Sequence, residues 1–424
     1  MRILIVNTSE RTGGAALAAN RLKEALNRNG EKAKMLVRDK ETDDLTVVGL
    51  HGGILSRWRF LWERWCIFFR LRFSRRHLFE LDIANTGHDI TSLPEFKEAD
   101  VIHLHWINQG MLSLGNIRKI LQSGKPVVWT MHDIWPATAI CHLTLGCRNF
   151  QNGCHHCKYL PGNGSSNDLS AKVWKKKKQL FDRSNIIMVA CSRWLAGEAK
   201  RSGLLQGQKV IAIPNPIDTS VYHPTDKTEA RQALGLPLDK QLILFVSQRA
   251  TNVNKGMIYL TDACQKLVEQ YPDIRERVAV MVLGGHAEDV TTDLPLPAYP
   301  LGYVNDTKRI VQVYNAADLF VLPSLSENLP NTIMEAMACG VPCIGFKVGG
   351  IPEMIEHHRT GYVARYKDAE DLAAGLHWLL TEADNNALSA AARQKVYREY
   401  SQNAVAVRYS EVYNEAIALK HYKL

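Results

Sequence analysis

Residues 323–353 read PSLSENLPNTIMEAMACGVPCIGFKVGGIPE, and this stretch decides the fold. An apolar run at residues 319–322 precedes it, and a second at residues 343–346 lies inside it. Short, uninterrupted apolar runs are typical of strands that are buried on both faces. Residues 332–338 have helical composition, and Gly340-Val341-Pro342 ends that helix. The order strand, polar loop, helix, strand predicts a parallel α/β sheet.

Two glutamates stand eight positions apart in this stretch, Glu327 in the polar loop and Glu335 in the helix. Ligands of open α/β sheets bind outside the carboxyl ends of the strands, which is where this loop is expected. A carboxylate accepts hydrogen bonds from two neighbouring hydroxyl groups, so both glutamates could address one polyhydroxylated ligand. The alternative is a helix with two surface glutamates.

Buried-strand patterns recur along the chain with helical segments between them, which predicts doubly wound parallel sheets. Residues 211–218 contain two prolines that flank Asn215, a pattern that cannot continue a helix and indicates a stiff linker between two sheets. We predict strands at residues 2–7, 32–37, 101–106, 127–131, 186–190, 210–213, 242–247 and 279–285, and helices at residues 371–380 and 386–419.

Two strand-to-helix turns have the composition of anion sites. Gly13-Gly14 follows the first strand and opens a helix, so backbone N–H groups would face an anion there, although a plain tight turn explains the glycines equally well. In the second half, Arg249 follows a strand and Lys255 precedes the next helix. Two cations beside a helix N-terminus favour a phosphate group, and ordinary surface charge is the alternative.

The motifs of the second half resemble a known family. The Glu-x7-Glu pair after a Pro-Ser strand end, the sequence EAMACGVP and the following GGIPE are similar to the retaining GT-B glycosyltransferases of family 4, also called glycosyl transferases group 1. The resemblance is strongest from Arg249 to Glu353, and it points to the polysaccharide-biosynthesis members that carry a Cys-rich insertion. It implies an α/β fold of two Rossmann-like doubly wound domains facing a central cleft. These would be residues 1–214 for the acceptor, residues 215–399 for the nucleotide sugar, and a helix at residues 400–424 that crosses back.

The resemblance also implies roles for individual residues. Arg249 and Lys255 match the family's diphosphate-binding pair, Glu327 would hold the transferred sugar, and Glu335 would hold the ribose. His132, at a strand end, matches a histidine near the donor sugar, and His103, His105 and Asp133 at neighbouring strand ends are weaker candidates for acceptor contacts. The remaining donor contacts implied are Gly14 in the first glycine loop, Tyr303 in the loop whose backbone meets the base, and the backbone around Asn328 and Leu329.

Four cysteines, Cys141, Cys147, Cys154 and Cys157, lie within seventeen residues, and the last two form a Cys-x2-Cys pair. Four thiolates on a short loop can close a tetrahedral Zn²⁺ site with a structural role. The first pair has a wider spacing than a zinc knuckle, so unligated thiols or redox chemistry are the alternatives.

Residues 56–79 are rich in arginine and aromatic residues, with seven arginines against the single acid Glu63. Trp58, Trp62 and Trp65 fall at helical spacing, which is typical of a helix lying on an anionic membrane surface. A core-packing helix with a solvated basic face explains the same pattern. A second basic stretch, residues 172–178, favours docking on a membrane.

The composition bears on the partners of the protein and on its location in the cell. The net charge of +9 favours anionic partners, and no apolar run approaches the ~20 residues that span a bilayer. The first residues, MRILIVNTSE, do not have the pattern of a signal peptide. The chain has nine cysteines, an odd number, which argues against a framework of disulfides. We therefore expect a cytoplasmic protein with reduced thiols, peripheral at the inner face of the cell membrane.

These observations predict a retaining glycosyltransferase whose catalysis needs no metal or other cofactor, because cations of the chain itself would stabilise the leaving diphosphate. Its expected partners are a UDP- or GDP-sugar and a glycan or lipid-linked glycan, and no nucleic acid. Two alternatives stay open: a basic nucleic-acid-binding protein with a zinc loop, and a sugar-nucleotide epimerase or phosphorylase on the same fold.

Overall fold

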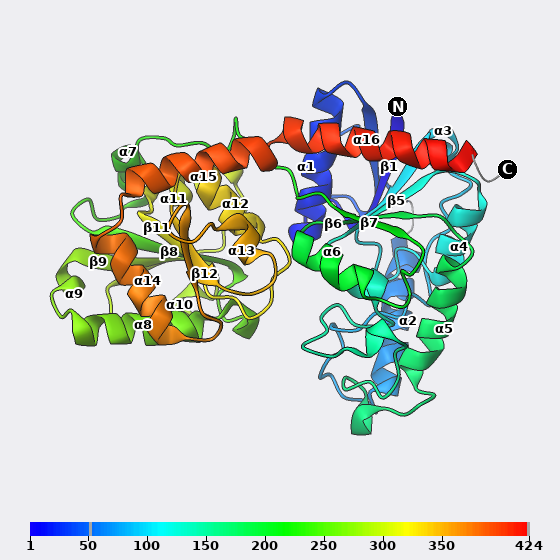
Figure 1. The fold of residues 1–424 in the computed structure, drawn as a ribbon, viewed down its shortest axis with the longest axis horizontal. Helices are drawn as coiled ribbons and strands as arrows, with labels where there is room; N and C mark the ends of the chain where they lie inside the picture. Colours follow the sequence, from blue (N-terminus) through cyan, green and yellow to red (C-terminus); the bar gives the residue numbers. More distant parts are fainter. Residues whose placement is uncertain (51–52, 422–424) are drawn as a thin grey trace. The chain divides into compact units, whose positions relative to one another are not determined.

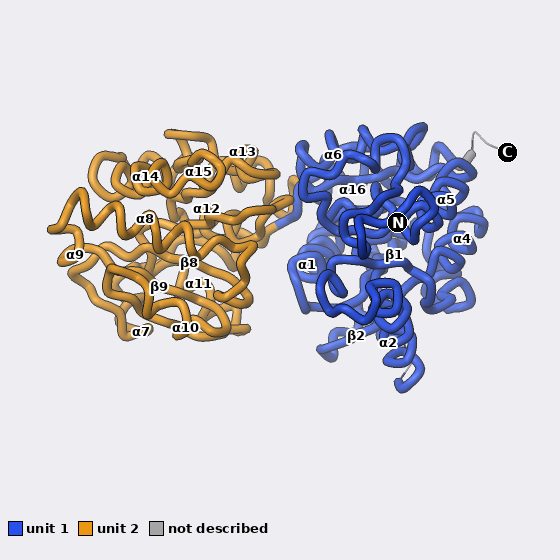
Figure 2. The backbone as a smooth tube through the Cα atoms, turned by 90° about the horizontal axis from the view of Figure 1, so that it is seen from below, with its two compact units in different colours: residues 1–216, 405–424 blue, residues 217–404 orange. Residues whose placement is uncertain are grey.

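The computed structural model describes residues 1–50 and 53–421, and the chain divides into two compact units (Figure 2). Unit 1 comprises residues 1–216 and the chain from Val405 onward, and unit 2 comprises residues 217–404. The sequence places the first boundary after residue 214 and the start of the returning segment at residue 400, so the chain crosses slightly later at both points.

Unit 1 is built on a seven-stranded sheet in which every neighbouring pair is parallel (Figure 1). The strand order is β3-β2-β1-β4-β5-β6-β7. The strands are β1 (Arg2–Ser9), β2 (Lys32–Asp39), β3 (Val47–Gly49), β4 (Val101–Leu104), β5 (Val127–Met131), β6 (Ile187–Ala190) and β7 (Lys209–Ala212). The helices are α1 (Gly14–Arg28), α2 (Gly53–Arg70), α3 (Pro94–Glu98), α4 (Leu114–Gln122), α5 (Leu169–Phe181), α6 (Arg193–Lys200) and α16 (Gln402–His421), whose first residues belong to unit 2.

The strands of unit 1 bury both of their faces, as their unbroken apolar runs predict. Successive side chains of a strand point to opposite faces. In β1, Ile3 and Ile5 belong to a core cluster shared with α1 and α16, whereas Leu4 and Val6 belong to a second cluster shared with α4 and α6. The sheet is therefore covered by helices on both sides, as in a doubly wound fold.

The helix predicted at residues 386–419 is interrupted. α15 (Asn385–Glu399) ends before Tyr400, and α16 begins at Gln402. The break pairs with the distant Ile217, whose N–H donates to the Tyr400 carbonyl (2.8 Å) and whose carbonyl accepts from the Gln402 N–H (3.1 Å). Further along α16, the Tyr409 and Tyr413 hydroxyls form hydrogen bonds inside unit 1, so this helix is fixed to the first sheet.

Unit 2 has a six-stranded parallel sheet with the order β10-β9-β8-β11-β12-β13. The predicted strands at residues 319–322 and 343–346 are found with those bounds. The strands are β8 (Gln241–Arg249), β9 (Val278–Gly285), β10 (Ala298–Gly302), β11 (Leu319–Leu322), β12 (Cys343–Phe346) and β13 (Gly361–Ala364). Its helices are α7 (Lys227–Leu234), α8 (Met257–Gln270), α9 (Ile274–Arg277), α10 (Ala287–Thr291), α11 (Thr307–Ala316), α12 (Asn331–Ala338), α13 (Ile351–Met354), α14 (Ala369–Thr381) and α15.

The fold confirms the two doubly wound sheets. In each sheet the strand order reverses direction at one point, between β1 and β4 in unit 1 and between β8 and β11 in unit 2. Ligands of open parallel sheets bind at the carboxyl ends of the strands beside such a switch point. These two places are therefore the expected ligand sites of the two units.

The aromatic helix predicted at residues 56–79 is shorter than expected, because α2 ends at Arg70. Arg72 and Phe73 adopt positive φ angles of 54° and 63°, and the Phe73 N–H donates to the Phe68 carbonyl (2.9 Å). This left-handed ending satisfies the last carbonyl groups of the helix and turns the chain away. None of the helices in the described ranges combines the length and apolarity that a membrane crossing requires.

Candidate functional site

The switch point of unit 2 brings two loops together. Arg249 ends β8 and the turn with Lys255 follows, while the loop from Pro323 to Glu327 follows β11. The Leu325 N–H donates to the Asn254 carbonyl (2.8 Å), and the Asn254 amide donates to the Ser326 carbonyl (3.0 Å). Gly256 has φ 75°, and a Cβ atom there would stand 1.9 Å from the Pro323 carbonyl oxygen, so the turn lies directly against the loop.

This contact brings the side chains of Lys255 and Glu327 together. The Lys255 ammonium lies 2.5 Å from Oε1 of Glu327, and the Ser324 hydroxyl donates to the same oxygen (2.9 Å). Both side chains are largely covered, at 26% and 12% exposed, so water screens the pair little. Arg249 is exposed, and its guanidinium makes no ion pair with any residue in the described ranges. Two cations against one carboxylate leave net positive charge for an anion.

Glu335 lies one turn into α12 and is 6% exposed. Its Oε2 accepts a hydrogen bond from the Tyr314 hydroxyl (2.9 Å). Burial and the neighbouring carboxylate hold the pKa of Tyr314 well above its usual value, so the phenol stays protonated and keeps donating. The carboxylate is thus held in one orientation beside the loop that carries Glu327.

The other donor-site candidates of unit 2 lie in loops. Asn328 and Leu329 directly precede α12, which begins at Asn331 after Pro330, one residue before the start that the sequence predicts. The Asn328 carbonyl accepts from the Gly350 N–H (2.9 Å), which holds this turn against the loop after β12. Tyr303 follows β10 and its side chain is exposed.

In unit 1, histidines gather where β4 and β5 end. Nδ1 of His105 and Nε2 of His132 are 2.9 Å apart, and the Cys191 thiol lies 3.5 Å from Nδ1 of His132. Burial lowers the pKa of His132 to about 4 and the pKa of His103 to about 3, so these rings are neutral near pH 7. His132 is half-buried and can act as a neutral hydrogen-bond partner, not as a cation.

His103 and Asp133, two of the weaker candidates for acceptor contacts, form hydrogen bonds with other residues of unit 1. His103 is fully buried, with one nitrogen 2.8 Å from the Tyr413 hydroxyl and the other 2.8 Å from the Thr130 hydroxyl. Asp133 accepts from the Trp106 indole (3.0 Å), from the Trp135 N–H (2.8 Å) and from His142 (2.8 Å). No motif or spacing of the sequence singles out His142. Burial opposes its protonation, but Asp133 raises the pKa of His142 above its usual value.

The glycine turn of unit 1 already holds a carboxylate of the chain. Oε1 of Glu41 accepts from the Thr12 N–H (3.2 Å), the Thr12 hydroxyl (2.9 Å) and the Ser9 hydroxyl (2.9 Å). Gly13 has φ 93°, a conformation that favours glycine, and a Cβ atom there would meet nothing within 4 Å. Helix α1 begins at the next residue, Gly14. The turn can bind an anion through its backbone, and Glu41 occupies part of it.

The four cysteines line one small cavity of about 20 Å³, which is room for a single ion or water molecule. Burial raises the pKa of Cys141 and of Cys154 to about 12, so these thiols are protonated. Within residues 1–50 and 53–421, no three His, Cys, Asp or Glu side chains are arranged so that they could share a metal ion. The structure therefore gathers the thiols at one place without a ready metal geometry.

The sequence and the fold match known proteins. Residues 12–221 match the family described as "Glycosyltransferase Family 4", and residues 240–382 match the family described as "Glycosyl transferases group 1". The chain is 28% identical over 226 residues to D-inositol 3-phosphate glycosyltransferase of Thermobispora bispora, which covers 50% of this chain and 52% of that protein. The chain thus spans about half the length of the curated relatives it matches.

Two solved structures share the whole architecture. Sucrose-phosphate synthase of Thermosynechococcus elongatus superposes with a TM-score of 0.67 at 20% identity, covering 98% of this chain and 99% of that one. HepE of Anabaena, solved in complex with UDP and glucose, superposes with a TM-score of 0.64 at 17% identity, covering 98% and 100%.

Two parallel doubly wound sheets, of seven and six strands, are the architecture of the GT-B class of proteins. With its two family matches, the chain has the GT-B fold of the group 1 and family 4 glycosyltransferases.

Proposed function

We propose that the protein transfers a sugar from a UDP- or GDP-sugar to a hydroxyl group of an acceptor. The observation that carries this proposal is the contact of Lys255 with Glu327 at the switch point of unit 2, with Arg249 at the end of the same β8 that leads into the turn of Lys255. A diphosphate needs fixed cations, and a sugar needs fixed hydrogen-bond acceptors. The UDP bound by HepE, which has the same fold, supports a nucleotide donor.

The leaving group is the centre of the mechanism. As the sugar C1–oxygen bond breaks, negative charge grows on the diphosphate, and Arg249 and Lys255 stabilise it electrostatically. The backbone around Asn328 and Leu329 adds N–H donors. Glu327, held by Ser324, accepts hydrogen bonds from hydroxyls of the sugar. Glu335, oriented by Tyr314, accepts them from the ribose, and the loop with Tyr303 meets the base.

The transfer proceeds with retention of the anomeric configuration. The acceptor oxygen forms its bond to C1 on the face that the diphosphate leaves, and the acceptor proton passes to the departing phosphate oxygen. No nucleophile of the chain is then required. His132, neutral because of its depressed pKa, offers a hydrogen bond to the donor sugar without adding charge. For the glycine turn at Gly14 we propose backbone contacts to the donor phosphate and the acceptor.

The acceptor proposed is a lipid-linked glycan of surface-polysaccharide synthesis. The basic and aromatic stretch that includes α2 supports this class, because such a surface suits an amphiphile in an anionic membrane. One relative is named D-inositol 3-phosphate glycosyltransferase, which makes small phosphorylated polyols the informative comparison.

A product assay tests this function. The full chain is incubated with each nucleotide sugar, with and without a lipid-linked disaccharide, and released nucleoside diphosphate and glycosylated product are measured. We expect acceptor-dependent release, with an α-linked product from an α-linked donor by NMR. A product of inverted configuration contradicts the retaining mechanism. Transfer to inositol phosphates alone contradicts the lipid-linked acceptor.

We also propose that the four cysteines of the small cavity close around one structural Zn²⁺. The support is their common cavity, and binding requires the sulfurs to draw together and lose their protons. Protein purified without chelator is expected to contain about one zinc per chain by elemental analysis, and Cys154→Ser with Cys157→Ser should lose it. Less than 0.1 zinc per chain together with four titratable thiols contradicts the metal site.

A further inference from the structure

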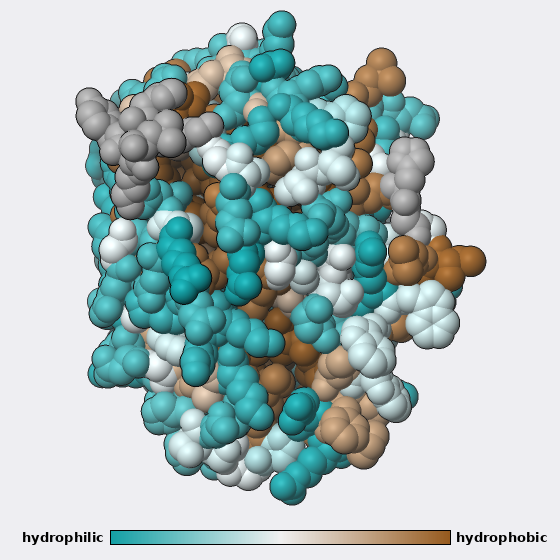
Figure 3. All heavy atoms as spheres, turned by 90° about the vertical axis from the view of Figure 1, so that its right-hand side faces the viewer, coloured by the Kyte–Doolittle hydropathy of each residue, from teal (hydrophilic) through white to brown (hydrophobic). Residues whose placement is uncertain are grey.

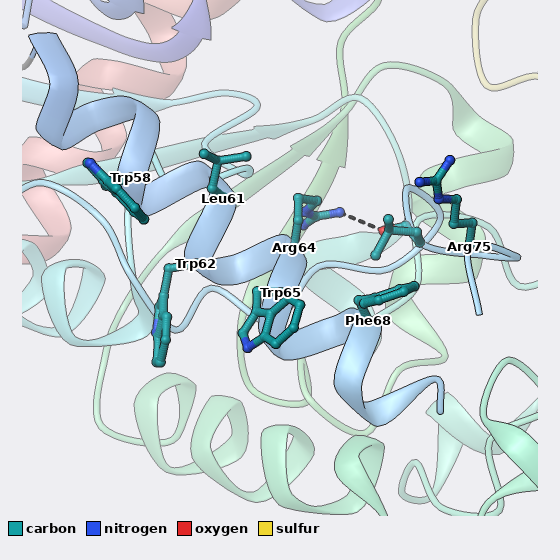
Figure 4. Close-up of a pocket in the computed structure, with 8 residues that line it drawn as sticks. Trp58, Leu61, Trp62, Arg64, Trp65, Phe68 and Arg75 are labelled. Carbon is teal, nitrogen blue, oxygen red and sulfur yellow. Dashed lines mark hydrogen bonds between the residues drawn. The ribbon is translucent and has the colours of Figure 1, made fainter. Parts of the chain in front are cut away.

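Helix α2 is fixed in unit 1 by an unusual set of buried residues, Glu63, Arg64 and the apolar Ile67. Oε1 of Glu63 accepts from the Ile83 N–H (3.1 Å) and the Ala84 N–H (2.7 Å). Arg64 donates to the Leu78 carbonyl (2.8 Å), the dashed contact in Figure 4, and lies 3.2 Å from the buried Asp82 carboxylate. These bonds fix the rotation of the helix about its axis.

The side of α2 that faces solvent carries the large apolar residues. Trp58, Trp62, Trp65 and Phe69 are 63%, 57%, 54% and 58% exposed. They continue a surface with exposed Ile54 and Leu55 at the start of the helix. Figure 3 shows hydrophobic and near-neutral side chains protruding along the right-hand edge of the face drawn there. Since Glu63, Arg64 and Ile67 are buried within unit 1, the exposure of the tryptophans is not removed by turning the helix inward.

The aromatic side chains also form a hollow. Trp58, Trp62, Trp65 and Phe68 line an open groove of about 540 Å³, together with Leu61, Arg64, Arg75 and Leu78 (Figure 4). Exposed apolar patches of this kind mark interaction sites in folded proteins. We name this surface, formed by α2 and the segment to Phe79, the tryptophan face.

The charge of the tryptophan face identifies its partner. Arg57, Arg70, Arg72, Arg75 and Arg76 are exposed. Between residues 53 and 79 the one acidic residue is Glu63, which is buried. The surface therefore shows positive charge without an acid of its own. Tryptophan rings settle at the boundary of lipid and water, and arginine side chains reach lipid phosphates. A partner that matches both features has an apolar interior beneath a negatively charged surface.

We propose that the tryptophan face docks onto an anionic lipid bilayer, with α2 parallel to the membrane plane. The tryptophans and Phe69 enter the boundary region, and the five exposed arginines lie against lipid phosphates. In the second basic stretch, residues 172–178, Lys177 is buried and donates to the Trp135 carbonyl (2.7 Å) and the Thr138 carbonyl (3.0 Å), so it is not available to a membrane. Lys172, Lys175 and Lys176 are exposed.

The test is co-sedimentation of the full chain with vesicles, in the absence of nucleotide and sugar, so it is independent of the transfer reaction. We expect binding to phosphatidylcholine vesicles with 30% phosphatidylglycerol, and at least tenfold weaker binding to phosphatidylcholine alone. Arg75→Gln with Arg76→Gln should weaken binding by about 25-fold, since each arginine near an anionic surface contributes about 1 kcal/mol. Trp62→Ser with Trp65→Ser should reduce binding at least tenfold on the anionic vesicles.

Two exposed residues away from the tryptophan face provide matched controls, Tyr397→Ser on α15 and Arg118→Gln on α4, and both should bind as the wild type does. Circular dichroism and thermal unfolding check that each variant is folded, and the arginine pair tests the proposal even if the tryptophan pair misfolds. Equal binding to both kinds of vesicle, or unchanged binding by folded variants, overturns the proposal. A lipid-free dimer that Trp62→Ser with Trp65→Ser converts to a monomer also overturns it, because a second copy then covers the face.

Discussion

Replacing Lys255 with methionine is expected to lower kcat by about 100- to 1,000-fold, the range found when one fixed electrostatic contact to a developing charge is removed. Methionine keeps the length of the side chain and removes its charge. Two effects combine in this variant. The leaving diphosphate loses one of its two cations, and Glu327 loses the ammonium that lies 2.5 Å from its carboxylate. Steady-state kinetics with the donor identified in the product assay gives kcat and KM separately.

Lys240→Met is the matched control for this prediction. Lys240 is a surface lysine just before β8, at the end of the strand opposite to Arg249, and it donates to the Glu276 carbonyl (2.6 Å). Because it removes one positive charge from the same unit, it tests for a general effect of net charge. We expect it to keep kcat within twofold. A folded Lys255→Met enzyme with the wild-type kcat would show that this lysine does not stabilise the leaving group.

Gly349→Ala is expected to destabilise unit 2 and to abolish donor binding. Gly349 has φ 56°, and an added Cβ atom would stand 1.7 Å from the carbonyl oxygen of Glu327. The loop that carries Glu327 must therefore move. We expect a loss of about 3 kcal/mol, from a strained backbone conformation and from the displaced loop together. Thermal unfolding should show a fall in Tm of about 6–12 °C, at 2–4 °C per kcal/mol for a unit of this size.

Gly235→Ala is the control that separates backbone strain from displacement of the Glu327 loop. Gly235 ends α7 with φ 67°, close to the angle of Gly349, but a Cβ atom there meets nothing within 4 Å. This control therefore has the backbone strain without the collision, and its expected cost is about 1 kcal/mol. Suppose that Gly349→Ala lowers Tm by no more than Gly235→Ala does, and that the variant still binds the donor. The loop of Glu327 then does not depend on the close approach of Gly349 to the Glu327 carbonyl.

The central strands could be predicted from the sequence because their apolar runs are continuous and end at turn residues. β5, β11 and β12 have the bounds that their sequences indicate. The strands not predicted, β3, β10 and β13, lie at sheet edges. An edge strand needs fewer apolar residues and tolerates Pro300, so its pattern is weak. The break at Tyr400 has no local signal, because it depends on pairing with Ile217 from a distant part of the chain.

The positions of some candidate site residues could also be predicted from the sequence. Strand ends and turn residues indicate where Arg249, Lys255 and Glu327 stand, since a parallel sheet brings its carboxyl ends to one edge. Tertiary contacts decide the rest. Glu41 reaches the glycine turn and His142 joins Asp133 through contacts that no spacing shows. For α2 the sequence allowed a core helix and a membrane helix equally, and only the burial of Glu63 and Arg64 tells which side is outside.

The central claim, that unit 2 binds a nucleotide sugar through Lys255 and Glu335, is tested most directly by thermal shift with a panel of UDP-, GDP-, ADP- and TDP-sugars. We expect stabilisation by uridine or guanosine nucleotides, of about 2.7 kcal/mol at 100 times Kd, and its loss in Glu335→Ala and in Lys255→Ala. That result would also name the base. No stabilisation by any nucleotide, with tight and salt-dependent binding to nucleic acid instead, would contradict the claim and leave only the fold.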